Sequence, residues 1–221
     1  MSLPPLTFNS WLRYDLIRRL LRDADGVKRV LEIGAGGGAM GARLARRFEY
    51  VGVEPDAGSF DTARARLAEV GKGTIVPGEV SALDPSATFD VVCAFEVLEH
   101  LVRPLEEFRG IAALGADWII TSTELHPGPK PAPDWHYLSV ESGQHVAFYR
   151  WDTLERLGRE TGYPHVIAGT FFQIFARKPF PAWKWRMAVR LGALAFPIVR
   201  KLRPSLTVSD CESIRSRLRG E

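Results

Sequence analysis

Cysteine is scarce in this sequence: only Cys93 and Cys211 occur among its 221 residues. Their spacing matches no metal-binding or redox motif and nothing indicates a disulfide framework, so we expect a reducing compartment. The sequence also lacks an uncharged run of about 18 residues, the length that a membrane-spanning helix needs. Its first residues do not show the basic and apolar regions of a secretory leader. These absences predict a cytoplasmic protein.

Acidic and basic residues are unevenly distributed along the chain. The sequence has 29 Lys and Arg against 26 Asp and Glu, a net charge of +3. Residues 177–221 alone carry +8, whereas residues 1–176 carry −5. We therefore predict a basic, amphipathic tail over residues 179–221. Peripheral contact with an anionic membrane and packing on the body or on a second subunit both suit such a tail, and monomer and homodimer stay open.

One stretch, Val30 to Met40, organises the rest of the sequence. Its apolar, strand-like start runs into four glycines within five residues, and a helix-like pattern follows. This is a strand, a tight turn and a helix N-terminus, in which glycines let the backbone approach a ligand and leave N–H groups facing it. The spacing Gly34-x-Gly36 also satisfies the dinucleotide fingerprint, so the loop alone does not separate an NAD site from another adenosine site.

Read from Glu32, the same stretch is acid-x-Gly-x-Gly-x-Gly, which resembles the first motif of the class I S-adenosylmethionine (SAM)-dependent methyltransferases. Glu54, at the end of the second predicted strand, can accept both ribose hydroxyls of an adenosine, in a SAM enzyme or an NAD enzyme alike. The resemblance implies SAM as cofactor and an adenine contact at Glu79-Val80. The predicted cofactor-binding residues are Glu32, Gly34, Ala35, Gly36, Gly38, Glu54, Pro55, Glu79, Val80, Phe95 and Glu96.

Strand-like and helix-like segments alternate through most of the chain. Apolar strands near residues 30–33, 50–54, 74–77, 89–95 and 118–123, separated by helices, predict a Rossmann-like, doubly wound parallel sheet with its ligand at the carboxyl edge. Two last strands, near residues 165–169 and 171–176, predict a terminal antiparallel hairpin. The fold class is thus α/β, with a seven-stranded, mostly parallel sheet, helices on both faces and one methyltransferase domain over residues 1–178.

The pattern breaks between residues 124 and 149. Four prolines in seven residues are followed by Asp-Trp-His-Tyr and Gly-Gln-His. A loop of this length in a compact domain is usually functional or disordered, and the aromatic residues argue against disorder. We predict a lid over the acceptor site.

Methyl transfer to a hydroxyl needs the hydroxyl proton removed, so a base or a metal should lie near strands four and five. The predicted catalytic residues are His145, His136 and His100. Glu96, Glu99 and His100 have i, i+3, i+4 spacing, and a helical turn would point all three the same way. Two carboxylates and an imidazole can bind a divalent cation, Mg²⁺ or Mn²⁺; ordinary helix pairing is the other interpretation.

The segment Phe-Glu-Val-Leu-Glu-His is similar to that of metal-dependent O-methyltransferases, including Hen-type small-RNA 2′-O-methyltransferases and ubiquinone-biosynthesis O-methyltransferases. The resemblance implies that His145 completes a site with Glu96, Glu99 and His100. The later Trp-His-Tyr and Gly-Gln-His-Val-Ala-Phe-Tyr segments are similar to bacterial methyltransferases associated with surface-glycan and sugar modification. That resemblance favours O-methylation of a hydroxyl on a sugar, glycan or other small molecule. RNA 2′-O-methylation and a non-catalytic or NAD-type binding protein are the alternatives. Nucleic acid is the less expected partner, because the excess basic charge lies in an apolar, Trp-rich tail.

Overall fold

The chain divides into two compact units, one of residues 26–180 and one of residues 1–25 with 181–221. The predicted domain boundary after residue 178 stays a prediction, since nearly all of the second unit, including most of the tail, lies outside the described part. This computed structural model describes residues 29–126, 128–140, 143–169, 172–181 and 183. The sheet and its helices belong to the unit of residues 26–180.

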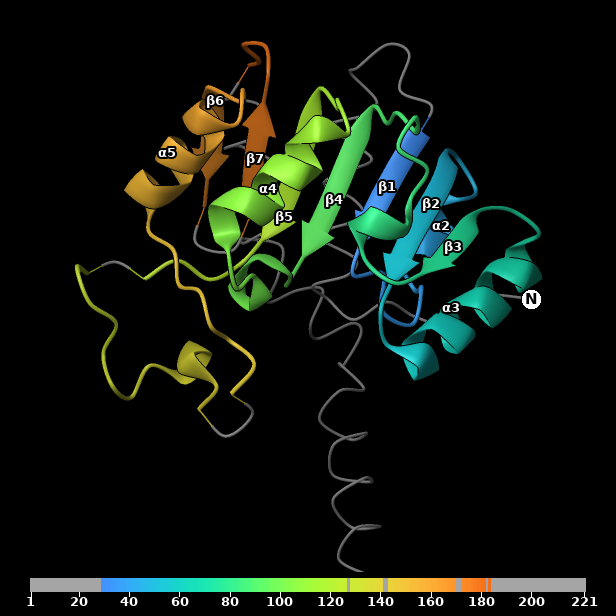
Figure 1. Cartoon of the computed structure of the whole chain (residues 1–221), viewed down its shortest axis with the longest axis horizontal. Helices are drawn as coiled ribbons and strands as arrows, with labels where there is room; N and C mark the ends of the chain where they lie inside the picture. Colours follow the sequence, from blue (N-terminus) through green and yellow to red (C-terminus); the bar gives the residue numbers. More distant parts are fainter. Residues whose placement is uncertain (1–28, 127, 141–142, 170–171, 182, 184–221) are drawn as a thin grey trace, which may run out of the picture. The chain divides into compact units, whose positions relative to one another are not determined.

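A seven-stranded sheet forms the centre of this unit (Figure 1). Its order is β3-β2-β1-β4-β5-β7-β6. Strands β1 to β5 are parallel, and β7 runs antiparallel to both β5 and β6, so the predicted mostly parallel sheet with a terminal hairpin is confirmed. The strands are β1 (Arg29–Ile33), β2 (Glu49–Glu54), β3 (Thr74–Pro77), β4 (Val91–Phe95), β5 (Trp118–Ser122), β6 (His165–Ala168) and β7 (Phe172–Ala176).

The strand order reverses between β1 and β4. The chain leaves β1 toward β2 on one side and later places β4 on the other side of β1. In open α/β sheets a ligand crevice forms at such a reversal, outside the carboxyl ends of the strands. The glycine loop follows β1 and Glu96 follows β4, so both lie at this crevice.

Helices cover both faces of the sheet. Successive side chains of a strand point to opposite faces, so each face presents side chains for helices to pack against. Leu31 faces the core that contains α4 and α5, which lie in front of the sheet in Figure 1. Tyr50 points to the opposite face of the sheet and lies against Gly41 of α2. Helix α3 contacts α2, β2 and β3. The helices are α2 (Gly41–Leu44), α3 (Ala57–Val70), α4 (Pro104–Ala113) and α5 (Trp151–Glu160), with 3₁₀ turns η1 (Val80–Ala82), η2 (Leu98–His100) and η3 (His136–Leu138).

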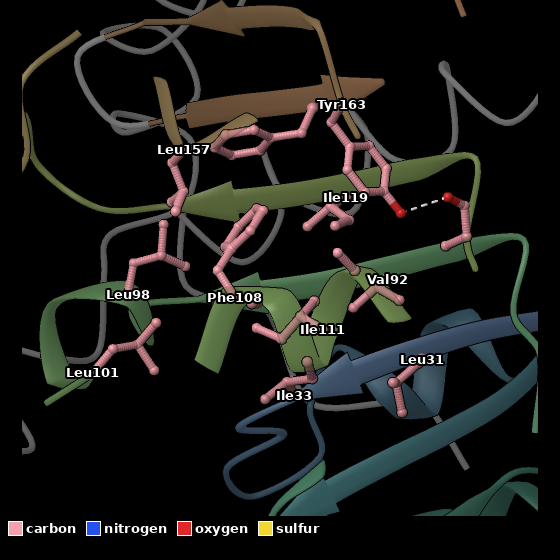
Figure 2. Packing of buried hydrophobic residues seen from close by; sticks show 14 of the residues in the cluster. Leu31, Ile33, Val92, Leu98, Leu101, Phe108, Ile111, Ile119, Leu157 and Tyr163 are labelled. Atoms are coloured by element: carbon pink, nitrogen blue, oxygen red, sulfur yellow. Dashed lines mark hydrogen bonds between the residues drawn. The ribbon is translucent and has the colours of Figure 1, made fainter. Parts of the chain in front are cut away.

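The main core lies between the sheet and the two helices α4 and α5. Figure 2 shows Phe108 and Ile111 of α4 packed with Ile119 of β5 and Leu157 of α5. Fully burying side chains of this size contributes about 1.5–3 kcal/mol each. Tyr163 adds a buried hydrogen bond, donating to the carbonyl of Ala116 at 2.7 Å (Figure 2). Among the described helices, none is long and apolar enough to cross a membrane.

The segment predicted as a lid leaves the carboxyl end of β5 and returns at α5 (Figure 1). Its two ends pair with each other: a β-bridge joins Leu125 to Tyr149, and the amide of His126 donates to the carbonyl of Tyr149 at 3.2 Å. Tyr149 donates a second bond to the carbonyl of Leu98, at 2.7 Å. The base of the loop is therefore fixed to η2, the turn that follows β4.

Candidate active site

The glycine loop needs glycine for two separate reasons. Gly34, Gly36 and Gly38 all have positive φ, between +53° and +70°, where other residues are strained. A Cβ on Gly34 would lie 2.9 Å from the Val97 side chain, and one on Gly38 would lie 2.9 Å from Ala63, so the fold itself requires these two. A Cβ on Gly36 would meet no atom within 4 Å. Gly36 therefore faces open space, where a ligand can approach the backbone.

Glu54 is held against the glycine loop by two backbone donors. The amide of Gly36 donates to Oε2 at 2.7 Å, and the amide of Asp56 donates to Oε1 at 2.9 Å. The side chain is buried, yet each carboxylate oxygen has more than one acceptor position. A fixed carboxylate with acceptor capacity left over suits a pair of ribose hydroxyls. That role of Glu54, and contact by the exposed Pro55 beside it, stay predictions.

Glu32 lies beneath the loop and has a partner within the fold. It is buried, and the phenol of Tyr50 donates to its Oε2 at 2.7 Å. Burial and the Glu32 carboxylate together hold the pKa of Tyr50 well above its usual range, so the phenol keeps its proton. Glu32 therefore supports the loop from below. Any contact of its own with the cofactor stays a prediction.

The predicted adenine contact lies at the carboxyl end of β3. Glu79 is exposed at the start of η1, which begins at Val80. Ala35, within the glycine loop, is tied to β2 by its amide, which donates to the carbonyl of Val53 at 3.0 Å. Phe95 is buried at the end of β4. These positions lie along the carboxyl ends of β1 to β4, where a bound adenosine would lie.

Glu96 directly follows β4 and adopts an unusual backbone conformation. Its φ is +54°, and residues other than glycine reach this region at a cost that is often found at functional sites. Two hydrogen bonds to Ser122, at the end of β5, hold Glu96 in place. The Ser122 hydroxyl donates to Glu96 Oε1 at 2.6 Å, and the Glu96 amide donates to the Ser122 carbonyl at 2.9 Å. The Glu96 side chain is thereby held exposed at the crevice.

Tyr137, in the lid, connects Glu96 with Glu99. Its hydroxyl lies 2.7 Å from Glu99 Oε1, 3.2 Å from Glu96 Oε2 and 3.2 Å from Thr123 Oγ1. A phenol has one proton, so it can donate to only one of the two carboxylates at a time. Burial is the main cause that raises the pKa of Tyr137, which excludes this phenol as a base near neutral pH.

Glu99, His100 and His145 are three of the four residues that the sequence predicts as metal ligands, and they lie together. Their candidate ligand atoms all lie within 4.8 Å of one another. Glu99 is buried, and its Oε2 has no hydrogen-bond partner in the described part of the chain. Burial is also the main cause that raises the pKa of Glu99. A buried carboxylate oxygen without a donor beside two imidazoles fits a bound cation.

Both imidazoles are oriented by backbone carbonyls. Nδ1 of His100 lies 2.9 Å from the carbonyl of Gln144, and Nδ1 of His145 lies 2.6 Å from the carbonyl of Tyr137. A carbonyl can only accept, so each Nδ1 carries a hydrogen. In the neutral ring, Nε2 then has a free lone pair that can bind a metal or accept a proton.

Two of the predicted site residues lie outside this three-residue group. Glu96 reaches the group only through the Tyr137 hydroxyl, which contacts both Glu96 and Glu99. The reason is that the helical turn begins only at Leu98, so that Glu96 lies before it with a positive φ. Its role as a fourth ligand stays a prediction. His136 points elsewhere: its Nε2 lies 3.1 Å from Glu124 Oε2, and its side chain is 76% exposed. A catalytic role for His136 also stays a prediction.

Sequence reasoning missed Tyr137, Ser122 and Glu124. Glu124 is buried and receives the indole N–H of Trp135 at 3.0 Å. The signal that could have found Tyr137 is its place in a Trp-His-Tyr run within the predicted lid, since buried aromatic hydroxyls need partners. Ser122 and Glu124 flank the end of β5, where parallel sheets place ligand-binding residues.

The fold and the crevice define a Rossmann-like enzyme domain for an adenosine-containing ligand. Its marks are the reversal of strand order, the open Gly36 and the fixed Glu54. The chain belongs to the methyltransferase domain family, whose model matches residues 8–166. It is a class I SAM-dependent methyltransferase, which confirms the predicted family, the enzyme class and SAM as cofactor.

Several relatives carry the name ubiquinone biosynthesis O-methyltransferase. The protein of Vibrio campbellii is 36% identical over 101 residues, which cover 43% of this chain and 43% of the relative. The protein of Bordetella avium is 32% identical over 132 residues, 57% of this chain and 54% of the relative. The chain thus spans about half the length of these relatives.

Solved structures show the same fold. The magnesium protoporphyrin IX methyltransferase from Synechocystis PCC 6803 with bound S-adenosylhomocysteine (SAH) superposes with a TM-score of 0.56 at 18% identity. The alignment covers 77% of this chain and 84% of that one. The N-terminal domain of EvdMO1 with bound SAH gives a TM-score of 0.55 at 18% identity, over 75% of this chain and 81% of that one. At this identity the likeness concerns the fold.

Proposed function

We propose that this methyltransferase transfers the methyl group of SAM to a hydroxyl oxygen of a sugar, glycan or other small molecule. The observation that carries the proposal is the Glu99, His100 and His145 group beside the cofactor crevice. An oxygen acceptor is supported because this group can take up a hydroxyl proton or hold a cation. The O-methyltransferase name of the relatives points the same way.

The protein has three tasks in such a reaction. Methyl transfer from a sulfonium is an in-line displacement, so the enzyme first aligns the donor methyl and the acceptor oxygen. The lid residue Tyr137 encloses the site and holds Glu99 and His145 in place. The free Nε2 of His100 or His145 accepts the proton that the hydroxyl releases as the methyl group arrives.

The same residues fit a divalent cation. Glu99, His100 and His145 would hold it, with Glu96 as the predicted fourth ligand. The fit is supported by Glu99 Oε2, which has no hydrogen-bond partner among the described residues. A bound cation would lower the pKa of the acceptor hydroxyl. One carboxylate and two imidazoles suit Mn²⁺ or Zn²⁺, and a second carboxylate would bring the set closer to Mn²⁺ or Mg²⁺.

Chelation separates the two ways of removing the proton. Transfer of labelled methyl from SAM to polysaccharide, small-molecule, RNA and lipid extracts is measured in excess chelator and again after adding Mn²⁺ or Mg²⁺. The proposal expects polysaccharide or small-molecule fractions to be labelled, and Glu99→Gln and His145→Ala to abolish the labelling. The control is His165→Ala, at the start of β6 and away from the crevice.

The outcomes of this experiment are distinct. Full activity in chelator would remove the metal and leave His145 or His100 as the base. Label in the RNA fraction alone would replace the proposed acceptor with RNA. Unchanged labelling by Glu99→Gln and His145→Ala would contradict the proposed chemistry.

A further inference from the structure

A pocket of about 700 Å³ lies beside the active site, and the steps of methyl transfer do not use it. It is formed where β5 ends, where α5 begins and where β6 ends. Because β6 runs antiparallel to β7, and β7 antiparallel to β5, the last residue of β6 reaches the same sheet edge as the last residue of β5. The pocket therefore opens at the edge that carries the cofactor crevice.

The lining is polar and aromatic. It includes Glu124, His126, Trp135, Arg150, Trp151 and Asp152. Arg150 is already paired with Asp152 at 3.2 Å, and Glu124 accepts bonds from Trp135 and from His136. Two carboxylates against one paired guanidinium leave the pocket with no excess positive charge for an anion.

One polar group in the lining has no partner in the described chain. His126 is 8% exposed, and its Nδ1 is fully buried without a hydrogen bond. A buried ring nitrogen in that state costs free energy unless a ligand or a water supplies the missing partner. This nitrogen is closed off from the pocket, so the groups that face an occupant are the two carboxylates and the two indoles.

We propose that this pocket binds the ring of a neutral, polyhydroxylated acceptor, a sugar. Carboxylate oxygens accept hydrogen bonds from ligand hydroxyls, and the two indoles offer flat apolar surfaces to the C–H faces of a pyranose ring. A purely apolar ligand would cover Glu124 and Asp152 without offering their oxygens a hydrogen bond. An anionic ligand would face both carboxylates. A sugar ring offers hydroxyls to the carboxylates and a C–H face to the indoles.

The pocket is connected to the reacting centre by one wall of aromatic side chains. Trp135 contacts Tyr137 with ring centroids 5.3 Å apart, and Tyr137 contacts His145 at 4.6 Å. Trp135 therefore lines the pocket while Tyr137, its neighbour, holds the catalytic group. A sugar site here rests on the proposed function and deepens it, since it assigns the acceptor class and names the residues that select it.

Ligand binding can be tested without turnover. Saturation-transfer NMR is recorded on the SAH-bound enzyme with three methyl glycosides (glucoside, galactoside and rhamnoside) and with catechol, a planar diol. The variants are Trp151→Ala and Asp152→Ala. The matched control is Asp61→Ala: Asp61 pairs with Arg64 at 2.9 Å and is 65% exposed, while Asp152 pairs with Arg150 and is 64% exposed.

The proposal expects at least one glycoside to bind through its ring C–H groups. Its affinity should fall about tenfold in Asp152→Ala, as expected for one lost hydrogen bond, and stay unchanged in Asp61→Ala. Absence of glycoside binding, a preference for catechol, or equal binding by the wild type and both pocket variants would overturn it.

Methyl transfer from labelled SAM, measured on the same proteins, keeps the two proposals apart. Glycoside binding that depends on Trp151 and Asp152 but gives no methylated product would refute the proposed function and keep the pocket. Methylation of a different hydroxyl compound, unaffected by both pocket variants, would refute the pocket and keep O-methyl transfer.

Discussion

Replacing Tyr137 by Phe removes one oxygen and tests how the lid supports the active site. The lost hydroxyl donates to Glu99 Oε1 at 2.7 Å, and Glu99 Oε2 already lacks a partner in the described part of the chain. A hydrogen bond to a charged group contributes about 1.5–3 kcal/mol net. Tyr137→Phe should therefore lower the free energy of unfolding by about that amount.

The matched control is Tyr149→Phe. Tyr149 is also buried and also donates at 2.7 Å, but its acceptor is the neutral carbonyl of Leu98. Losing a bond of this kind should cost about 0.5–1.5 kcal/mol. We further expect Tyr137→Phe to reduce methyl transfer, because Glu99 and the Tyr137-bound His145 lose their fixed arrangement, and Tyr149→Phe to retain most of it.

Urea unfolding followed by circular dichroism gives the two free energies, and a double-mutant cycle with Glu99→Gln isolates the interaction. The cycle should return a coupling energy of about 1 kcal/mol or more between Tyr137 and Glu99. A coupling energy near zero, or equal costs for Tyr137→Phe and Tyr149→Phe together with unchanged activity, would show that the lid does not hold Glu99.

Three further predictions concern the cofactor loop, the core and the tail. Calorimetry should show that SAH binds at least tenfold more weakly to Gly36→Ala and with unchanged affinity to Gly71→Ala. Gly71 is the matched control because its φ is also positive and an added Cβ also meets no atom within 4 Å. Equal affinities of the two variants would contradict an open ligand face at Gly36. Burial raises the pKa of the Cys93 thiol, so a Cys211→Ser protein should not react with Ellman's reagent until it is unfolded, and rapid labelling would be contrary evidence. In flotation with anionic liposomes, the full chain should be recovered with the vesicles and a 1–178 truncation should not, whereas equal recovery would exclude membrane contact by the tail.

Most of the fold could be predicted because its signals are local. The position of the crevice can be predicted from two short segments, the strand–glycine–helix pattern at Val30–Met40 and the apolar strand before Glu96. The helix after the glycine loop is shorter than its pattern indicates, only Gly41–Leu44, although turns continue to Phe48. Alternation of strands with helices was enough to predict the sheet and its antiparallel hairpin.

The active site was predictable only in part, because it depends on a loop that returns across the sheet edge. Spacing and a resemblance together predict that Glu99, His100 and His145 meet. Their candidate ligand atoms lie within 4.8 Å of one another, and their role stays a prediction. The position of Glu96 outside this group was not predicted, because residue spacing does not reveal that its φ is positive. Contacts between Tyr137 and Glu99, 38 residues apart, depend on the path of the lid, which no local pattern specifies.

The pocket lined by Trp135 could not be predicted from the sequence, because it too depends on the path of the lid. Its lining combines the end of β5, the lid and the start of α5, segments that the chain brings together only when folded. The composition of the Trp135 region indicated an ordered loop. It did not indicate which side chains would face a ligand.

Transfer of the methyl group to oxygen is the step on which the proposed function depends. It can be observed with SAM that carries a ¹³C-labelled methyl group and an acceptor extract, because the carbon chemical shift of the product distinguishes methyl on oxygen, nitrogen, carbon and sulfur. We predict a methyl ether, formed by the wild type and by His165→Ala and lost when His100 and His145 are both replaced by Ala. A label on nitrogen or carbon, or an ether formed equally well by the protein that lacks both His100 and His145, would contradict this chemistry.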